Sequence, residues 1–330
     1  MNSLGRMIPY RHLLPAGPAS RRSREQLSSL ALARSGTAAT LRERLGGFVA
    51  LTKPRIVELL LVTTLPTMIV AAHGMPPTAL VIATLAGGTL AAGGANATNM
   101  YLDRDIDAVM ARTARRPLVT GVVTPREALV FAIGLEAAAF ALLWGEVNLL
   151  SAALALGATL FYVLVYTLWL KRTSVQNIVI GGAAGAVPVL VGWAAVRGSI
   201  SLAPLLLFAL IFVWTPPHFW ALAFRYRDDY RAVHVPMMPA VAPLQRVARW
   251  IGVYSLLVVA TSLGFGWAAR TGLVYWVAAA ASGAVLLAYS GRLLAEQTEA
   301  RAMQLFHWSI TYVTLLFAAM ALDQFVHLRT

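Results

Sequence analysis

The chain has 330 residues, of which 58% are hydrophobic and only 12% are charged. Soluble domains carry about 25% charged residues, so this chain lacks the charge to cover a surface that faces water. The mean hydropathy of +0.68 therefore excludes soluble globular, disordered and fibrous proteins and indicates a polytopic membrane protein. Because the chain has no cysteine, disulfides, thiolate catalysis and cysteine-ligated metal clusters are excluded as well.

The N-terminal segment, residues 1–46, is rich in arginine, with eight Arg against two Glu. This composition predicts a disordered basic tail on the cytoplasmic side, and an organelle presequence is the alternative. The rest of the chain, residues 47–330, is expected to form a single membrane domain. Nine spans of about 20 residues fill most of that length and leave no room for a second soluble domain.

Apolar segments long enough to cross the bilayer recur along the whole domain. They predict an all-α fold of nine transmembrane helices near residues 55–73, 77–101, 126–144, 149–169, 177–197, 201–222, 247–269, 272–290 and 306–326.

Lysine and arginine are divided unequally between alternate connections, with 24 on the set that includes the N-terminus and 3 on the other. Cytoplasmic connections carry the excess of basic residues, so the N-terminus is predicted inside and the C-terminus outside. The basic residues are scattered between apolar runs, which argues against nucleic acid as a partner and for the lipid bilayer. A bacterial plasma membrane is predicted, with the mitochondrial inner membrane as the alternative.

The connection after the second span begins with three oxygen-bearing side chains, Asn99, Asp103 and Asp107. Their spacing of four residues places them on one face of a helix. Mg²⁺ prefers carboxylate oxygens together with substrate phosphates, so this stripe predicts a magnesium–diphosphate site. A solvated helix end with its acidic residues paired to nearby arginines is the alternative. Asp105 points to the opposite side and is assigned no ligand role.

A second polar connection follows the sixth span and carries Tyr226, Asp228 and Asp229. Its carboxylates are candidate ligands of a second cation, and Tyr226 is a candidate substrate contact. Arginine suits phosphate because of its planar fork of donors. The candidate diphosphate ligands on this membrane face are Lys53, Arg112, Arg116, Lys171, Arg172 and Asn177.

Two polar residues, His218 and Glu136, lie within predicted membrane spans, where a purely structural span would carry apolar residues. His218 follows Pro216 and Pro217, which are expected to break the sixth helix and free backbone carbonyls beside a cavity. A histidine can ligate heme iron, and a hydrogen-bonded structural histidine is the alternative. Glu136 lies in the middle of the third span with no partner in the sequence, and no role is assigned to it.

The motifs of both connections resemble those of the UbiA-type intramembrane prenyltransferase superfamily, over about residues 47–326. The first acidic motif marks the superfamily as a whole. Other blocks are similar to its protoheme IX farnesyltransferase (heme O synthase) branch: Leu51-Thr-Lys-Pro-Arg55, Gln176-Asn-Ile-Val-Ile-Gly-Gly182, Trp214-Thr-Pro-Pro-His-Phe-Trp220, Tyr226-Arg-Asp-Asp-Tyr230 and Pro236-Met-Met-Pro239. The superfamily's second motif has two Asp four residues apart, whereas here Val233 stands four after Asp229. Which of Asp228 and Asp229 contacts a metal therefore stays open.

This resemblance implies a helical bundle around a central cavity that opens to the cytoplasmic side. It implies farnesyl diphosphate and heme b as substrates, heme o as product and Mg²⁺ as cofactor. Catalytic roles would fall to Asp103, Asp107, Lys171 and Arg112, and a heme contact to His218. Heme A synthase, which would act on the product, is a candidate partner. The alternatives are a prenyltransferase acting on a quinone precursor ring and, in a different class, a small-molecule transporter.

Overall fold

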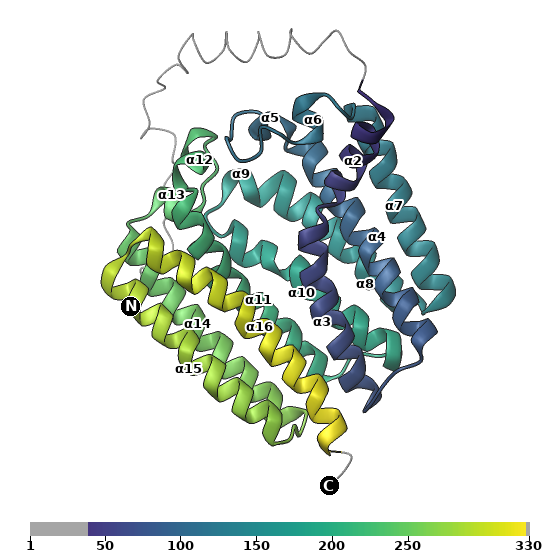
Figure 1. The fold of residues 1–330 in the computed structure, drawn as a ribbon, viewed down its shortest axis with the longest axis vertical. Coiled ribbons are helices and arrows are strands. Elements are labelled where there is room, and N and C mark those ends of the chain that lie inside the picture. The colour runs from purple at the N-terminus through teal and green to yellow at the C-terminus, as the bar shows by residue number, and fades with distance from the viewer. Residues whose placement is uncertain (1–38, 328–330) are drawn as a thin grey trace, which may run out of the picture. The chain divides into compact units, whose positions relative to one another are not determined.

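The structure is a computed structural model that describes residues 39–327, without the side chains of residues 55–61 and 327. The predicted tail as far as residue 38 and the side chain of Arg55 lie outside this description. The chain divides into two units, Met1–Leu41 and Arg42–Thr330. All regular secondary structure in the described residues is helical, as Figure 1 shows. The predicted domain boundary at residue 46 falls inside the first described helix, α2 (Leu41–Thr52).

The long helices follow one another with short connections on one side and two long connections on the other (Figure 1). They are α3 (Pro54–Ala72), α4 (Thr78–Leu102), α7 (Pro125–Glu146), α8 (Leu149–Leu160) continued by the π-helix η2 (Phe161–Leu170) and α9 (Lys171–Thr173), α10 (Asn177–Arg197), α11 (Leu202–Arg225), α14 (Leu244–Ala268), α15 (Leu273–Glu296) and α16 (Glu299–His327).

Eight of these helices are long and apolar enough to cross a membrane, among the residues that the structure describes. Each coincides with one of the nine predicted spans. The remaining predicted span corresponds to α3, whose described apolar part, Val62–Ala72, is shorter. The chain is therefore an all-α polytopic membrane protein.

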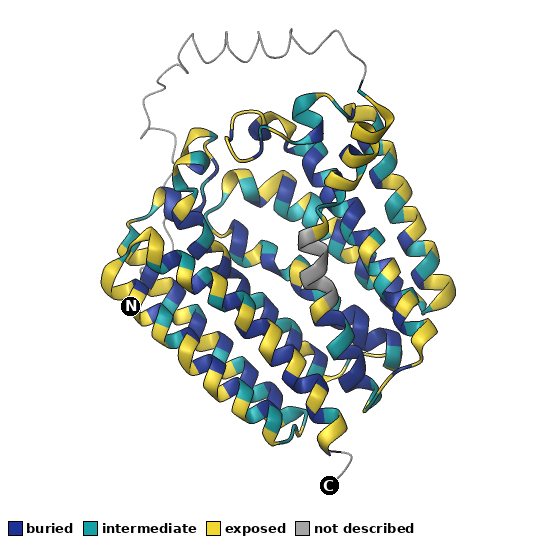
Figure 2. Ribbon diagram, viewed as in Figure 1, coloured by how far each residue is buried: buried dark blue, intermediate teal, exposed yellow. Residues whose placement is uncertain are grey.

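Large apolar side chains on the outer faces of the helices are exposed, as the yellow bands in Figure 2 indicate. Trp144, Leu205, Trp267 and Val277 are each between 48% and 77% exposed. In water such a surface would be unfavourable, whereas lipid acyl chains solvate it without cost. Small residues allow the inner faces to approach closely; a Cβ on Gly87 of α4 would lie only 2.5 Å from the Leu143 side chain of α7.

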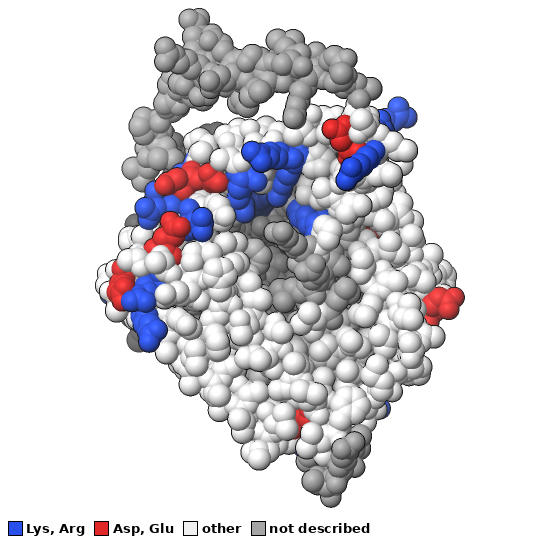
Figure 3. Space-filling model, in the orientation of Figure 1, with Lys and Arg blue, Asp and Glu red and all other residues white. Residues whose placement is uncertain are grey.

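The two long connections contain short helices and lie at the same end of the bundle (Figure 1). The first holds α5 (Arg104–Asp107) and α6 (Pro117–Thr120), and the second holds α12 (Arg227–Ala232) and α13 (Met238–Val241). Figure 3 shows that Lys and Arg side chains gather at this end around a hollow in the molecular face, while the lower part of the face is almost free of charge.

The expected break at Pro216 and Pro217 is wrong, because α11 continues through both prolines to Arg225. Each proline removes one backbone donor. Transmembrane helices tolerate this loss because neighbouring helices satisfy the freed groups. Both prolines are buried in the bundle, where packing holds the helix together. His218 therefore lies on an uninterrupted helix instead of in an opened segment.

Candidate active site

The acidic stripe begins on α4 and crosses a helix junction. α4 ends at Leu102, Asp103 has φ −90° and ψ 3°, and α5 starts at Arg104. The prediction of one continuous helix is therefore wrong at this point. The helical spacing of four residues is nevertheless kept across the junction, because Asp103 N donates to Asn99 O and Asp107 N donates to Asp103 O, each at 2.9 Å. All three side chains are buried, Asp103 completely.

Asn99 is held in one orientation by three partners. Its Nδ2 donates to Asp103 Oδ2 at 2.7 Å and to Thr167 Oγ1 at 3.1 Å, and its Oδ1 accepts from Lys53 Nζ at 2.9 Å. Thr167 gives its own hydroxyl proton to the carbonyl of Tyr162, so it accepts from Asn99. This network fixes the amide with its oxygen toward the cations, which leaves one lone pair of Oδ1 for a further ligand.

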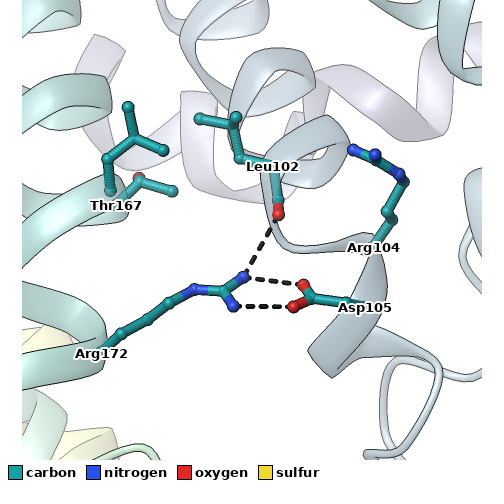
Figure 4. A pocket seen from close by; sticks show the side chains of 6 residues that line it. Leu102, Arg104, Asp105, Thr167 and Arg172 are labelled. Carbon is teal, nitrogen blue, oxygen red and sulfur yellow. Dashed lines mark hydrogen bonds and ion pairs between the residues drawn. The ribbon is translucent and has the colours of Figure 1, made fainter.

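Two cations from the end of the fourth span reach the same carboxylates. Lys171 Nζ donates to Asp103 Oδ2, and Arg172 lies 3.6 Å from Asp103 Oδ1. Arg172 also binds both oxygens of Asp105 at 2.7 Å, in a pocket of about 410 Å³ (Figure 4). This hydrogen-bonded pair lowers the pKa of Asp105 to about 2. Asp105 therefore orients Arg172 from outside the stripe.

Asp107 pairs with Arg116 of the same connection. Lys53 completes the group, since Arg116, Lys171, Asp103 and Asp107 all act electrostatically on its ammonium. Burial, and after it the charges of Arg116 and Lys171, lower the pKa of Lys53 from 10.5 to about 7. The positive charges of Arg116 and Lys171 beside Lys53 would also favour a bound anion.

The residues present fit a magnesium ion bound together with a phosphate-bearing ligand. Asp103 Oδ1 is buried and has no hydrogen-bond partner, although its other oxygen has two. Arg172, at 3.6 Å, offsets part of the cost of burying this oxygen, and a bound Mg²⁺ would offset more. No group of three or more His, Asp or Glu side chains among the described residues could hold a metal by itself. Mg²⁺ is commonly held by one or two carboxylates and completed by phosphates and waters.

An aromatic wall from η2 lies beside the stripe, and the sequence alone did not predict it. The rings of Tyr162 and Tyr166 stack at 5.3 Å between centroids. Thr167 of the same π-helix accepts from Asn99 Nδ2 at 3.1 Å and donates to the Tyr162 carbonyl, so η2 runs beside the stripe. The π-helix turns the two tyrosines to one side, and π-helical segments often occur at functional sites. A pattern of apolar residues does not reveal a π-helix.

His218 is buried on α11 between two aromatic rings. The ring of Trp214 stacks on it at 4.3 Å and that of Phe306 at 4.6 Å. His218 Nδ1 lies 2.8 Å from Ser309 Oγ, and the Ser309 hydroxyl donates to Phe306 O at 2.7 Å. Because the serine proton is used there, Nδ1–H donates to Ser309, and Nε2 keeps its lone pair.

The second connection is joined to the first through Arg112 and not through its carboxylates. Arg112 donates to the Tyr230 hydroxyl at 2.9 Å and lies over the ring of Tyr226. Asp228 is 79% exposed and pairs with Arg231 at 3.0 Å. The structure thus brings Asn99, Asp103, Asp107, Lys53, Arg116 and Lys171 together, with Arg172 at their edge. No described contact links Asp228 or Asp229 to this group.

Two other residues from the sequence analysis have defined surroundings. Asn177 begins α10 and is completely buried, and neither atom of its side-chain amide has a hydrogen-bond partner. Its amide therefore has unused hydrogen-bonding capacity, and no described side-chain contact joins it to the acidic stripe. Glu136 of α7 accepts from Thr159 Oγ1 at 3.1 Å and lies against Gly94 of α4. This contact supplies the partner that the sequence did not show and explains the carboxylate as a link between helices.

Comparison with known proteins places these residues in a family context. A model of the UbiA prenyltransferase family matches residues 60–316. A protein of Streptomyces avermitilis named protoheme IX farnesyltransferase is 53% identical over 289 residues, which cover 86% of this chain and 95% of that protein. A protein of the same name from Frankia casuarinae is 54% identical over 85% of this chain and 98% of its own length.

Solved structures show the same fold at low sequence identity. A digeranylgeranylglyceryl phosphate synthase aligns with a TM-score of 0.71 at 16% identity, over 86% of this chain and 99% of that one. A UbiA homologue from Aeropyrum pernix aligns at 0.63 and 23% identity, over 80% of this chain and 97% of its own. A UbiA homologue from Archaeoglobus fulgidus, bound to DMAPP and Mg²⁺, aligns with a TM-score of 0.60 at 16% identity, over 83% of this chain and 98% of that one.

Proposed function

Because the chain belongs to the UbiA prenyltransferase family, and matches proteins named protoheme IX farnesyltransferase at 53–54% identity over most of its length, we propose that it farnesylates heme b. The donor is farnesyl diphosphate and the product is heme o. The observation that carries the proposal is the buried stripe of Asn99, Asp103 and Asp107 within a group of cations, with Asp103 Oδ1 free of hydrogen bonds and 3.6 Å from Arg172. The Mg²⁺ and DMAPP named for the Archaeoglobus fulgidus homologue support a metal–diphosphate site here.

Diphosphate departure is the step that this stripe serves. Mg²⁺, when bound by Asn99, Asp103 and Asp107, neutralises charge on the leaving group. Lys171 and Arg116 pair with the carboxylates and Lys53 donates to Asn99, so all three cations are placed to act on the same oxygens. Arg172 is oriented by Asp105, and the free amide of Asn177 is a further donor. Asp228 or Asp229 is proposed to supply a second cation site from the other loop.

The departing diphosphate leaves an allylic farnesyl cation, which must be kept from water until the acceptor attacks. A porphyrin vinyl group forms the new carbon–carbon bond, and water then adds to the resulting cation and loses a proton, giving a hydroxyethylfarnesyl group. The stacked rings of Tyr162 and Tyr166 belong to the π-helix that contacts Asn99 through Thr167, and they shield this step. Aromatic faces also stabilise nearby positive charge.

The acceptor is proposed to lie against His218. The Nδ1–H of this ring is held by Ser309, so Nε2 presents its lone pair to the heme iron. A metal-bound histidine ordinarily donates its other N–H to a fixed acceptor, as here. The stacked rings of Trp214 and Phe306 restrain the imidazole.

The finer description of the membrane domain is part of the same proposal. Nine spans, with α3 as the first, would surround a central cavity that opens to the cytoplasmic side, and the loops with the acidic residues would lie there. The N-terminus would be cytoplasmic and the C-terminus outside. The bacterial origin of the named relatives supports a bacterial plasma membrane.

The test is expression of the full chain in membranes that make heme b but no heme o, followed by mass analysis of extracted hemes. The expected result is a heme heavier than heme b by one farnesyl group and one hydroxyl, formed only when both farnesyl diphosphate and Mg²⁺ are supplied. Diphosphate release without a modified heme, but with a prenylated phenol, would indicate the quinone-precursor reaction instead. No diphosphate release with any acceptor would exclude a prenyltransferase and favour a carrier.

A further inference from the structure

The two loops at the active end, residues 103–124 and 226–243, pack against each other. Ile106 and Met110 of the first loop are buried in one apolar cluster with Tyr230, Val235 and Met237 of the second. The loops therefore form one cap. The acidic residues of the second loop, Asp228 and Asp229, lie on the same short helix as Tyr230. The contacts of Tyr230 therefore attach this helix to the first loop.

Arg112 is the polar link in this cap. One of its guanidinium nitrogens donates to the Tyr230 hydroxyl at 2.9 Å, and its Cζ lies 5.2 Å from the ring centroid of Tyr226 and 5.2 Å from that of Tyr230. A planar guanidinium can stack on aromatic rings and donate a directed hydrogen bond at once, which an ammonium cannot do. Among the ion pairs of the described residues, none joins Arg112 to a carboxylate.

We propose that Arg112 is a positioning residue that fixes the second loop through Tyr226 and Tyr230. It thereby sets where Asp228 and Asp229 lie relative to Asp103. Tyr230 belongs to the same helix as the two carboxylates, α12 (Arg227–Ala232), so restraining its ring restrains them. The catalytic consequence rests on the proposed function, whereas the structural link does not.

The structural link is tested without substrate. The chain has no cysteine, so Ala108→Cys and Ala232→Cys, at exposed positions of the two loops, allow two spin labels whose distance distribution is measured in the full-length protein in nanodiscs. We expect one narrow distribution, which broadens in Tyr230→Phe and in Arg112→Lys. The matched control is Arg292→Gln, which removes another arginine lying over a tyrosine, Tyr289, and should leave the distribution unchanged. An unchanged width in Arg112→Lys overturns the proposal.

The kinetic test uses the same substitutions in the cysteine-free chain. Arg112→Lys keeps the charge but loses the stacking fork, and Tyr230→Phe keeps the ring but loses the hydrogen-bond acceptor. Each should raise the Mg²⁺ concentration for half-maximal heme o formation about 3- to 10-fold and lower kcat at saturating Mg²⁺ by a smaller factor, since each weakens a link of modest strength. The double variant should be no worse than Arg112→Lys alone, because both changes break one link.

Multiplicative effects in the double variant would show that Arg112 and Tyr230 act independently. A normal Mg²⁺ requirement in Arg112→Lys would show that the arginine acts only as a point charge. Either result would overturn the positioning role. Failure of the proposed function gives a different result. If the parent chain makes no heme o but the label distances still broaden in Arg112→Lys and Tyr230→Phe, the link between the loops is supported and the assigned reaction is wrong.

Discussion

At the scale of single residues, Asp103 differs from the other carboxylates in being completely buried and in having one oxygen without a donor. Substitution by Asn keeps the shape but removes the charge that Mg²⁺ and Lys171 require. We expect Asp103→Asn to lower the rate of heme o formation by about 100-fold or more, the usual cost of losing a group that stabilises transition-state charge. Asp105→Asn is the matched control, because Asp105 is 60% exposed and pairs only with Arg172 at the edge. A similar loss in both variants would contradict the assignment.

His218 leads to a spectroscopic prediction at the same scale. If Nε2 binds the heme iron, replacing His218 by Ala removes an axial ligand and shifts the Soret band of bound heme b. Ser309→Ala keeps the ligand but frees the ring to change its tautomer, because Ser309 accepts the Nδ1 proton. This variant should bind heme with a smaller shift and a weaker affinity. Identical spectra for the parent and His218→Ala would show that the histidine is structural.

The sequence predicts a site residue when its position depends on local spacing. It does not predict the partners that a residue contacts from distant parts of the chain. Asn99, Asp103 and Asp107 follow from a spacing of four, which survives the helix junction. The partners of Asp105 and Arg112 do not follow, because Arg172 and Tyr230 are 67 and 118 residues away in the chain. The prediction for Asp228 and Asp229 stays untested.

At the scale of helices, the close approach of α10 to η2 depends on a glycine. A Cβ on Gly181 would lie 2.4 Å from a ring carbon of Tyr166, so the ring must move. We expect Gly181→Ala to destabilise the protein by about 1–3 kcal/mol through overpacking and to lower activity by displacing the aromatic wall.

Gly185→Ala on the same helix is the control, because no atom lies within 4 Å of its added Cβ. Alanine favours a helix over glycine by about 1 kcal/mol, so this variant should hold or raise the unfolding temperature. Thermal unfolding in detergent and heme o formation measure both effects. Equal unfolding temperatures and equal activities of the two variants would mean that Tyr166 and η2 shift at little cost to accommodate the added methyl group.

Helix positions could be read from hydropathy because a bilayer-length apolar run is a local property. The third span, predicted at 126–144, is observed as Pro125–Glu146. The last helix shows where this fails: predicted at 306–326, it begins at Glu299. Its first turns are polar, since they extend beyond the apolar region, and hydropathy does not distinguish a polar helical turn from a loop. The π-helix within the fourth span is hidden for a related reason, because its residues are as apolar as those of an α-helix.

At the scale of the whole molecule, the charge distribution determines the expected orientation. Basic residues gather at the end that carries both acidic loops (Figure 3), and cytoplasmic loops attract such residues. The active site would then open to the compartment where soluble diphosphates are made. The opposite orientation would require translocation of 24 basic residues, counted over the connections of the predicted set.

The absence of cysteine makes this orientation directly testable. Ala300→Cys lies at an exposed position in the first turn of α16, and Ser199→Cys lies in the exposed connection between α10 and α11, at the other end of a span. In intact bacterial cells, a membrane-impermeant maleimide should label Ser199→Cys at once and Ala300→Cys only after permeabilisation. Both variants should still make heme o, since neither position touches the site. Labelling of Ala300→Cys in intact cells would place the acidic loops outside, where neither magnesium-bound farnesyl diphosphate nor newly made heme b could reach them from the cytoplasm.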